Sequence, residues 1–182
     1  DGAPSRATEM RLSGGTLRYG EPVNVTVRDR ATPNINHTME LTPLIYADGD
    51  TEIIYAGGAV IRSEPEGSVM LQEPPFVLRS DRTVLPFVRT TRAGGQTSLT
   101  RDGTVRVETS RTNINATTRS GLSDASRLEL VVESTHETAW EEYLESVAER
   151  DSDWSLVDDN VLEFETEAVS IPRFRVLLRL VD

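Results

Sequence analysis

The 182-residue chain contains neither cysteine nor lysine. The absence of cysteine excludes a disulfide framework, a thiolate metal site and a cysteine nucleophile. All nineteen basic residues are arginine, which is a biased composition because lysine is ordinarily common. No apolar run approaches the roughly 18 to 20 residues that a membrane-spanning helix needs, and the first ten residues lack the regions of a signal peptide. We therefore expect the sequence as it stands to be soluble.

Carboxylates dominate the charge of the chain. Thirty acidic residues against nineteen arginines give a net charge of -11. This excess repels itself at ordinary ionic strength, whereas at molar salt the screening length falls to about 3 Å and the repulsion largely disappears. The composition predicts a protein of a salt-loving organism, with an acidic mesophile protein from a GC-rich genome as the alternative. Along the sequence the arginines are scattered among acids, which argues against nucleic acid as a partner.

Short alternating segments separated by turn residues predict a mainly β fold. We expect one β-rich domain over residues 1–182, of the α+β class, with antiparallel sheets or a sandwich of short strands and hairpins. Three hairpins are predicted: 39–46 with 51–55 around Asp48-Gly49, 96–100 with 104–109 around Asp102-Gly103, and 154–157 with 161–164. The Ser, Thr and Asn-rich segment 110–126 is interpreted as a long surface loop.

One helix is predicted at about 135–149. Ser134 precedes Glu137 by three residues, which is the spacing of a capping box. Apolar residues then recur at the spacing of one helix face, with glutamates mostly opposite. We expect this face to pack on the sheet through the structural anchors Trp140, Tyr143 and Leu144.

Groups for catalysis are few. The two histidines, His37 and His136, lie in no recognised nucleophile, metal or phosphate motif, and we interpret both as structural. Acidic clusters such as Asp48 with Asp50 could suit calcium, but thirty carboxylates produce such clusters by chance. The sequence therefore predicts no enzyme, no cofactor and no metal site. A carboxylate-dependent hydrolase, which needs two facing carboxylates, is an alternative.

Three sequons offer sites for N-glycosylation at Asn24, Asn36 and Asn115. Asn115 is expected to be the best acceptor because it falls in the predicted polar loop, whereas Asn24 is expected within a strand. The sequons modestly favour an external location.

A resemblance to a known family follows from the order of several segments. The series TPLIYADGDTEIIYAGGAVIRSEPEGSVMLQEPPF, with Tyr46 and Tyr55 as structural anchors, precedes LVVESTHETAWEEYLE. This arrangement resembles the globular part of haloarchaeal type IV pilin-like proteins from about residue 39 to the C-terminus.

The resemblance implies a structural subunit, anchored at the surface of an archaeal cell and extracellular, that forms a filament or adheres. Its partners would be other copies of itself or other pilin-like subunits. Family members begin with an apolar helix for the membrane and the filament, which this chain lacks. We expect that the anchor was removed; the alternative is a relative that works without it. The alternative is an extracellular module that binds glycan or protein, for which Tyr19, Tyr46 and Tyr55 would provide contacts if they formed an exposed patch.

Overall fold

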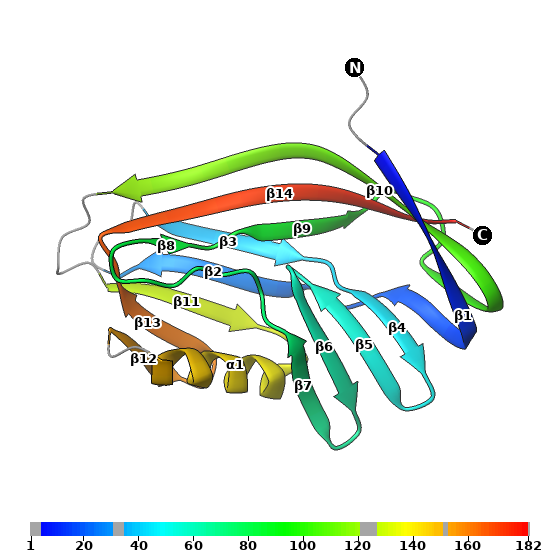
Figure 1. The fold of residues 1–182 in the computed structure, drawn as a ribbon, viewed down its shortest axis with the longest axis horizontal. Coiled ribbons are helices and arrows are strands. Elements are labelled where there is room, and N and C mark those ends of the chain that lie inside the picture. The colour runs from blue at the N-terminus through cyan, green and yellow to red at the C-terminus, as the bar shows by residue number, and fades with distance from the viewer. Residues whose placement is uncertain (1–4, 31–34, 121–126, 151–152, 182) are drawn as a thin grey trace.

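The computed structural model describes residues 5–30, 35–120, 127–150 and 153–181 (Figure 1). These residues are mostly β-strand, and one helix lies among them, which confirms the predicted mainly β class with a helix. The larger sheet contains β1 (Ser5–Tyr19), β4 (Leu44–Asp48), β5 (Thr51–Ala56), β6 (Ala59–Glu64), β7 (Gly67–Gln72), β8 (Thr83–Val84), β9 (Phe87–Arg92), β10 (Ser98–Ser120) and β14 (Ala168–Val181). The smaller sheet contains β2 (Val23–Asp29), β3 (Asn36–Leu41), β11 (Arg127–Glu133), β12 (Trp154–Asp158) and β13 (Val161–Glu165), and the helix is α1 (Glu137–Arg150).

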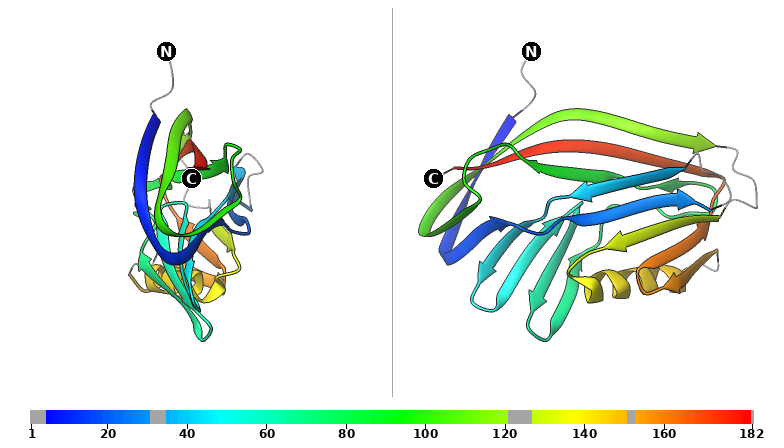
Figure 2. Two further views of the ribbon diagram at one scale, coloured as in Figure 1. Left: turned by 90° about the vertical axis from the view of Figure 1, so that its right-hand side faces the viewer. Right: turned by 180° about the vertical axis from the view of Figure 1, so that it is seen from behind.

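Three long strands form the frame of the larger sheet. Its order is β7-β6-β5-β4-β1-β10-β14-β8, and β9 also pairs with β14. β1 is antiparallel to β10 from Ser5↔Ser110 to Arg18↔Ser98. β14 is antiparallel to β10 from Arg106↔Val181 to Ser120↔Ala168. β10 therefore lies between the first and the last strand of the chain, along one long side of the molecule (Figures 1 and 2).

The main core draws residues from both sheets and from α1. The smaller sheet has the order β12-β13-β11-β2-β3, and alternate residues of β2 are buried, as are Leu128, Leu130 and Val132 of β11. α1 contacts β7, at the edge of the larger sheet, and β12, at the edge of the smaller sheet. The helix thus covers the side on which these two edges lie. The largest fully buried side chains of this core are Phe87, Phe164, Leu41, Ile54, Ile61, Leu85, Leu128, Leu130, Leu144 and Leu162.

A second, smaller core lies where the long strands β1, β10 and β14 meet β4. We call it the end core; its buried members are Leu12, Leu17, Leu99, Val105, Val107, Leu178 and Leu180. Tyr46, one of the predicted anchors, is half-buried against it. The alternation of these apolar residues with exposed arginines fixes which face of the long strands points inward.

The helix begins at Glu137 and ends at Arg150, within two residues of the predicted bounds. Trp140, Tyr143 and Leu144 are buried as expected, and Trp140 meets Tyr143 edge-on with ring centroids 6.1 Å apart. No helix in the described ranges is long and apolar enough to cross a bilayer.

The predicted capping box at the start of α1 does not form. The Ser134 hydroxyl accepts a hydrogen bond from the backbone N–H of His136 at 3.1 Å. The first turn is instead capped from the larger sheet, because the Ser68 hydroxyl on β7 accepts from the N–H of Ala139 at 3.2 Å. A side chain distant in sequence therefore satisfies one of the first-turn amides that have no partner within the helix.

Two predictions about residues 96–120 are wrong. The expected hairpin at Asp102-Gly103 and the expected loop from residue 110 onward are both parts of the continuous strand β10, which runs to Ser120; residues 121–126 of that loop lie outside the described residues. An Asp-Gly pair makes a hairpin turn only when its flanks pair with each other. Here the residues on both sides of Gly103 pair with β1. Beyond Ser110 the strand is held by β14, and its threonines suit a strand because they are β-branched.

The expected strand 39–46 is also divided. Leu41 ends β3 in the smaller sheet and Leu44 begins β4 in the larger sheet, because Pro43 between them lacks an N–H for a sheet ladder. β4 and β5 do pair antiparallel around Gly49, from Leu44↔Tyr55 to Asp48↔Thr51. Pro86 separates β8 from β9, and each of these strands pairs in parallel with β14.

Candidate functional site

Charge is divided between two groups of strands. β1, β9, β10 and β14 contain three, two, four and three arginines, which is twelve of the nineteen in the chain, but only three of its thirty carboxylates. Their formal charge is therefore +9, and the remainder of the chain, with seven arginines and twenty-seven carboxylates, carries -20. β14 pairs with β9 and β10, and β10 with β1, so these strands adjoin in the larger sheet. The arginines are scattered along the sequence, but the fold gathers them.

Four exposed arginines share one face of these strands. Arg106 alternates with buried Val105 and Val107, and Arg179 alternates with buried Leu178 and Leu180. Both guanidinium groups therefore lie on the face opposite the end core. Arg175 is four residues from Arg179 on the same strand, and the register places it beside Arg89 of β9. We call Arg89, Arg106, Arg175 and Arg179 the arginine surface.

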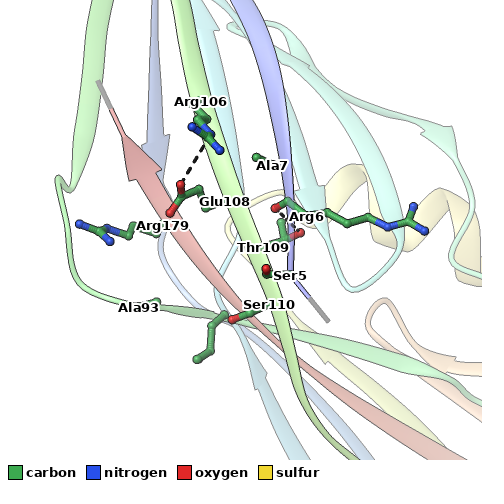
Figure 3. A pocket seen from close by; sticks show the side chains of 10 residues that line it. Ser5, Arg6, Ala7, Ala93, Arg106, Glu108, Thr109, Ser110 and Arg179 are labelled. Carbon is green, nitrogen blue, oxygen red and sulfur yellow. Dashed lines mark hydrogen bonds and ion pairs between the residues drawn. The ribbon is translucent and has the colours of Figure 1, made fainter. Parts of the chain in front are cut away.

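A groove of about 510 Å³ opens at one end of the arginine surface (Figure 3). Glu108 lies within it, and Arg106 Nε lies 3.6 Å from Glu108 Oε1. Figure 3 shows Arg179 on the neighbouring strand and the side chain of Arg6 extending away from this pair. The groove is lined by Ser5, Arg6, Ala7, Ala93, Arg106, Glu108, Thr109, Ser110, Leu177 and Arg179.

The arginine surface is only partly neutralised. Glu108 is the one acidic residue that lines the groove, and its side chain is 38% exposed. Neither Arg89 nor Arg179 forms an ion pair with a carboxylate among the residues that the structure describes. Guanidinium groups offer several N–H donors in a planar fork that matches a carboxylate. The surface can therefore accept carboxylates or other anions.

Acidic residues surround a second hollow on the opposite long side of the molecule, at the N-terminus of α1 (Figure 1). This acidic hollow measures about 420 Å³ and is lined by Val132, Glu133, Ser134, Glu137, Trp140, Glu141, Asp158, Asp159 and Asn160. None of its five carboxylates forms an ion pair with an arginine in the described part of the chain.

Local structure explains how these carboxylates gather. Glu133 is the last residue of β11, and Glu137 occupies the first turn of α1, where a helix dipole favours negative charge. The turn between β12 and β13 carries the two aspartates and is fixed to β11, because the N–H of Val132 donates to the carbonyl of Asn160 at 3.0 Å. Trp140 lines the hollow, is only 2% exposed, and its indole Nε1 has no hydrogen-bond partner in the structure.

The three sequons lie on three different strands. Asn24 is half-buried within β2, as expected, and Asn36 is exposed at the first position of β3. Asn115 is exposed, but it lies within β10 opposite Arg173 and not in a loop. The expectation that a loop makes Asn115 the best acceptor therefore fails for this position.

The histidines lie in separate places. His37 is on β3 and His136 precedes α1, and both are half-buried. Burial lowers the pKa of His136, while Glu52 acts in the opposite direction and Arg18 reinforces the effect. Among the residues described, no three His, Asp or Glu side chains are close enough together to hold a metal ion.

The tyrosines named as possible contacts are not freely exposed. Tyr19, Tyr46 and Tyr55 are all half-buried. Tyr19 donates its hydroxyl hydrogen to the carbonyl of Leu178 at 2.9 Å, and burial raises the pKa of both Tyr19 and Tyr55. The large apolar residues that are exposed in the described ranges are all aliphatic: Met10, Val69, Leu71, Val77 and Val157. A contiguous aromatic patch for a glycan is therefore not formed by the described residues.

Sequence reasoning missed both charged sites. The arginine surface joins residues that are far apart in the chain, such as Arg89 and Arg175, and only the register of β9 on β14 brings them together. A signal was nevertheless present, since residues 168–181 contain three arginines and no carboxylate. For the acidic hollow, the sequence shows the two aspartates beside Asn160, but it does not show that they lie close to α1.

Comparisons with known proteins place the chain in a family without assigning an activity. No curated protein and no solved structure matches it. A family model matches residues 1–180, which is nearly the whole chain. The chain therefore belongs to DUF7289, a family of unknown function.

Proposed function

We propose that the chain is the head of a structural cell-surface subunit, extracellular and anchored to a salt-loving archaeal cell, of the pilin-like kind that its sequence resembles. In this proposal the two sheets act as one β-sandwich head built largely of hairpins. The head carries out no reaction, and an apolar helix encoded ahead of the head anchors it.

The observation that carries this proposal is the position of β10 between the first and last strands. A subunit tethered through its N-terminal side experiences a pull on β1. β1 is hydrogen-bonded along β10 from Ser5 onward, and β10 in turn along β14. A pull along β1 would load many backbone hydrogen bonds at once, in shear, and this suits a head that must hold its shape outside a cell.

The charge of the molecule fits the same role. The -20 carried outside β1, β9, β10 and β14 keeps most of the surface hydrated. Asn36 and Asn115, both exposed, are the sequon positions where glycans meet the least obstruction.

Localisation tests the proposal. An antibody raised against the head should label intact producing cells in electron microscopy, and mechanical shearing should release the labelled material. The upstream coding sequence should contain about twenty apolar residues. Labelling that requires permeabilised cells would refute the surface role.

A further inference from the structure

The arginine surface and the acidic hollow carry opposite charge. The strands β10 and β14, which carry three of the four arginines, lie along the opposite long side of the molecule from α1, at whose N-terminus the hollow lies (Figures 1 and 2). We propose that copies of the chain associate head to tail, with the arginine surface of one copy docked against the acidic hollow of the next. This inference rests on the proposed function, because a structural subunit acts through contacts with its own copies.

Charge complementarity supports a second copy as the occupant. The hollow gathers five carboxylates that have no arginine partner in the described structure, and the arginine surface gathers four guanidinium groups, of which Arg106 and Arg179 line the groove with Glu108. Within an isolated copy each set repels itself. Docking pairs the two sets, and hydrogen bonds between ionised partners are roughly twice as strong as neutral ones.

Trp140 supplies an independent indication that the hollow receives a partner. Its indole N–H is buried and has no acceptor among the residues that the structure describes, and buried donors are seldom left without an acceptor. The groove beside the arginine surface contains the hydroxyls of Ser5, Thr109 and Ser110, which can accept hydrogen bonds. A second copy therefore offers cations for the carboxylates, and its hydroxyls can accept from the indole once docking turns the Trp140 side chain toward the hollow.

The placement of the two sites determines the kind of assembly. Because they are different surfaces on opposite sides, the contact is heterologous. A copy that has used its arginine surface still presents its acidic hollow. Heterologous contacts build rings or open filaments, whereas a self-complementary patch would stop at a dimer.

High salt weakens the attraction between the two surfaces but does not abolish it. Exposed charges lose their long-range attraction at high salt, but pairs buried in an interface are screened much less. Subunits held on one surface also meet at a high effective concentration. The association should therefore be measured first at low ionic strength, where it is strongest.

Sedimentation equilibrium of the chain in about 0.15 M sodium chloride, where the screening length is about 8 Å, tests the proposal. We expect species larger than dimers that grow with protein concentration. Two double variants neutralise one side each: Arg89→Gln with Arg179→Gln, and Glu133→Gln with Asp159→Asn. Each should raise the dissociation constant at least about tenfold, which corresponds to about 1.4 kcal/mol. The matched control, Arg79→Gln with Arg82→Gln outside the four strands, should associate like the unaltered chain.

A mixture of the two double variants gives the sharpest result. At a concentration where each is monomeric alone, the equimolar mixture should form dimers and nothing larger, because each variant retains one working side. Thermal melting checks that every variant is folded.

Three results would overturn the proposal. The first is an unaltered chain that stays monomeric at millimolar concentration. The second is association that survives neutralisation of the hollow. The third is a monomeric chain whose arginine surface binds heparin, a polyanion, which would identify an anionic partner of another kind. Failure of the surface labelling with association intact would refute the proposed location and leave the contact standing.

Discussion

Arg150, the last residue of α1, holds Glu73 through two hydrogen bonds, from Nη1 to Oε2 at 3.1 Å and from Nη2 to Oε1 at 2.6 Å. Glu73 directly follows β7, so the pair joins the C-terminal end of the helix to the edge of the larger sheet. A cation at this end of a helix is also favoured by the helix dipole.

This pair predicts a dependence of stability on acid. The hydrogen bond from Arg150 lowers the pKa of Glu73 below its ordinary value of 4.5. A carboxyl with a lowered pKa in the folded state stabilises the protein above the unfolded pKa, and this contribution is lost as the pH falls through the folded pKa. Because both side chains are about half exposed, we expect only about 0.2 to 1 kcal/mol.

This prediction is checked by urea unfolding of the unaltered chain and of Glu73→Gln between pH 3 and pH 7. This pH range includes the ordinary pKa values of carboxyl groups, roughly 3.5 to 4.5. The variant should be less stable near neutral pH and converge on the unaltered chain at the acid end. Glu66→Gln is the control, because Glu66 is exposed and forms no ion pair with any described residue. Parallel pH profiles for Glu73→Gln and the unaltered chain would contradict the prediction.

Glu129 is a buried carboxylate in the middle strand of the smaller sheet. Its side chain is 1% exposed, and Arg28 Nε lies 2.6 Å from Glu129 Oε2, with Arg30 paired to the other oxygen. Glu129→Gln should lower the free energy of unfolding by about 1.5 to 3 kcal/mol, the range for hydrogen bonds to charged groups. The exposed arginines remain solvated in the variant, which keeps the loss moderate.

Chemical denaturation measures this loss, with Glu165→Gln as the matched control. Glu165 also pairs with an arginine, Arg127, at 3.5 Å, but its side chain is 49% exposed. The control should change stability by less than about 1 kcal/mol. Equal losses in the two variants would show that burial of Glu129 does not matter.

Trp140 should be the most sensitive position of α1. It is nearly fully buried and packs against Tyr143. Trp140→Ala should cost about 3 to 5 kcal/mol, because it removes a large apolar surface and leaves a cavity. Trp140→Phe should cost clearly less, since the indole N–H has no partner to lose. Thermal and urea unfolding measure both, and an equal cost for the two variants would contradict this explanation.

Salt should stabilise the folded chain. Outside the four arginine-rich strands, twenty-seven carboxylates face seven arginines, and their repulsion falls as the screening length shrinks from about 10 Å at 0.1 M to about 3 Å at 1 M. The melting temperature should therefore rise from dilute buffer to molar potassium chloride, while association between copies weakens. A flat or falling melting temperature would exclude repulsion as a major destabilising effect.

Sequence patterns predicted those helices and strands whose own residues show the spacing of the element. The hairpin of 154–157 with 161–164 and the helical spacing of Trp140, Tyr143 and Leu144 are both local patterns, and the structure contains both elements. The class of the fold followed from many such segments.

The long strands were beyond such reasoning. Residues 110–120 have little apolar pattern, and they are a strand because β14 supplies hydrogen-bond partners from Ala168 to Leu177. The arginine surface also depends on pairing between distant strands, because the register of β9 on β14 places Arg89 beside Arg175. A pattern within about ten residues does not indicate which distant segment will pair with it.

The arrangement of β1, β10 and β14 also constrains when the molecule can form. β10 acquires its second neighbour only when Ala168–Val181 becomes available, and these residues follow β10, α1 and every strand of the smaller sheet in the chain. Pairings so distant in sequence are slow to close. The larger sheet should therefore be completed only once β14 has been synthesised, and until then the half-covered β10 would be the part of the nascent chain most in need of a chaperone.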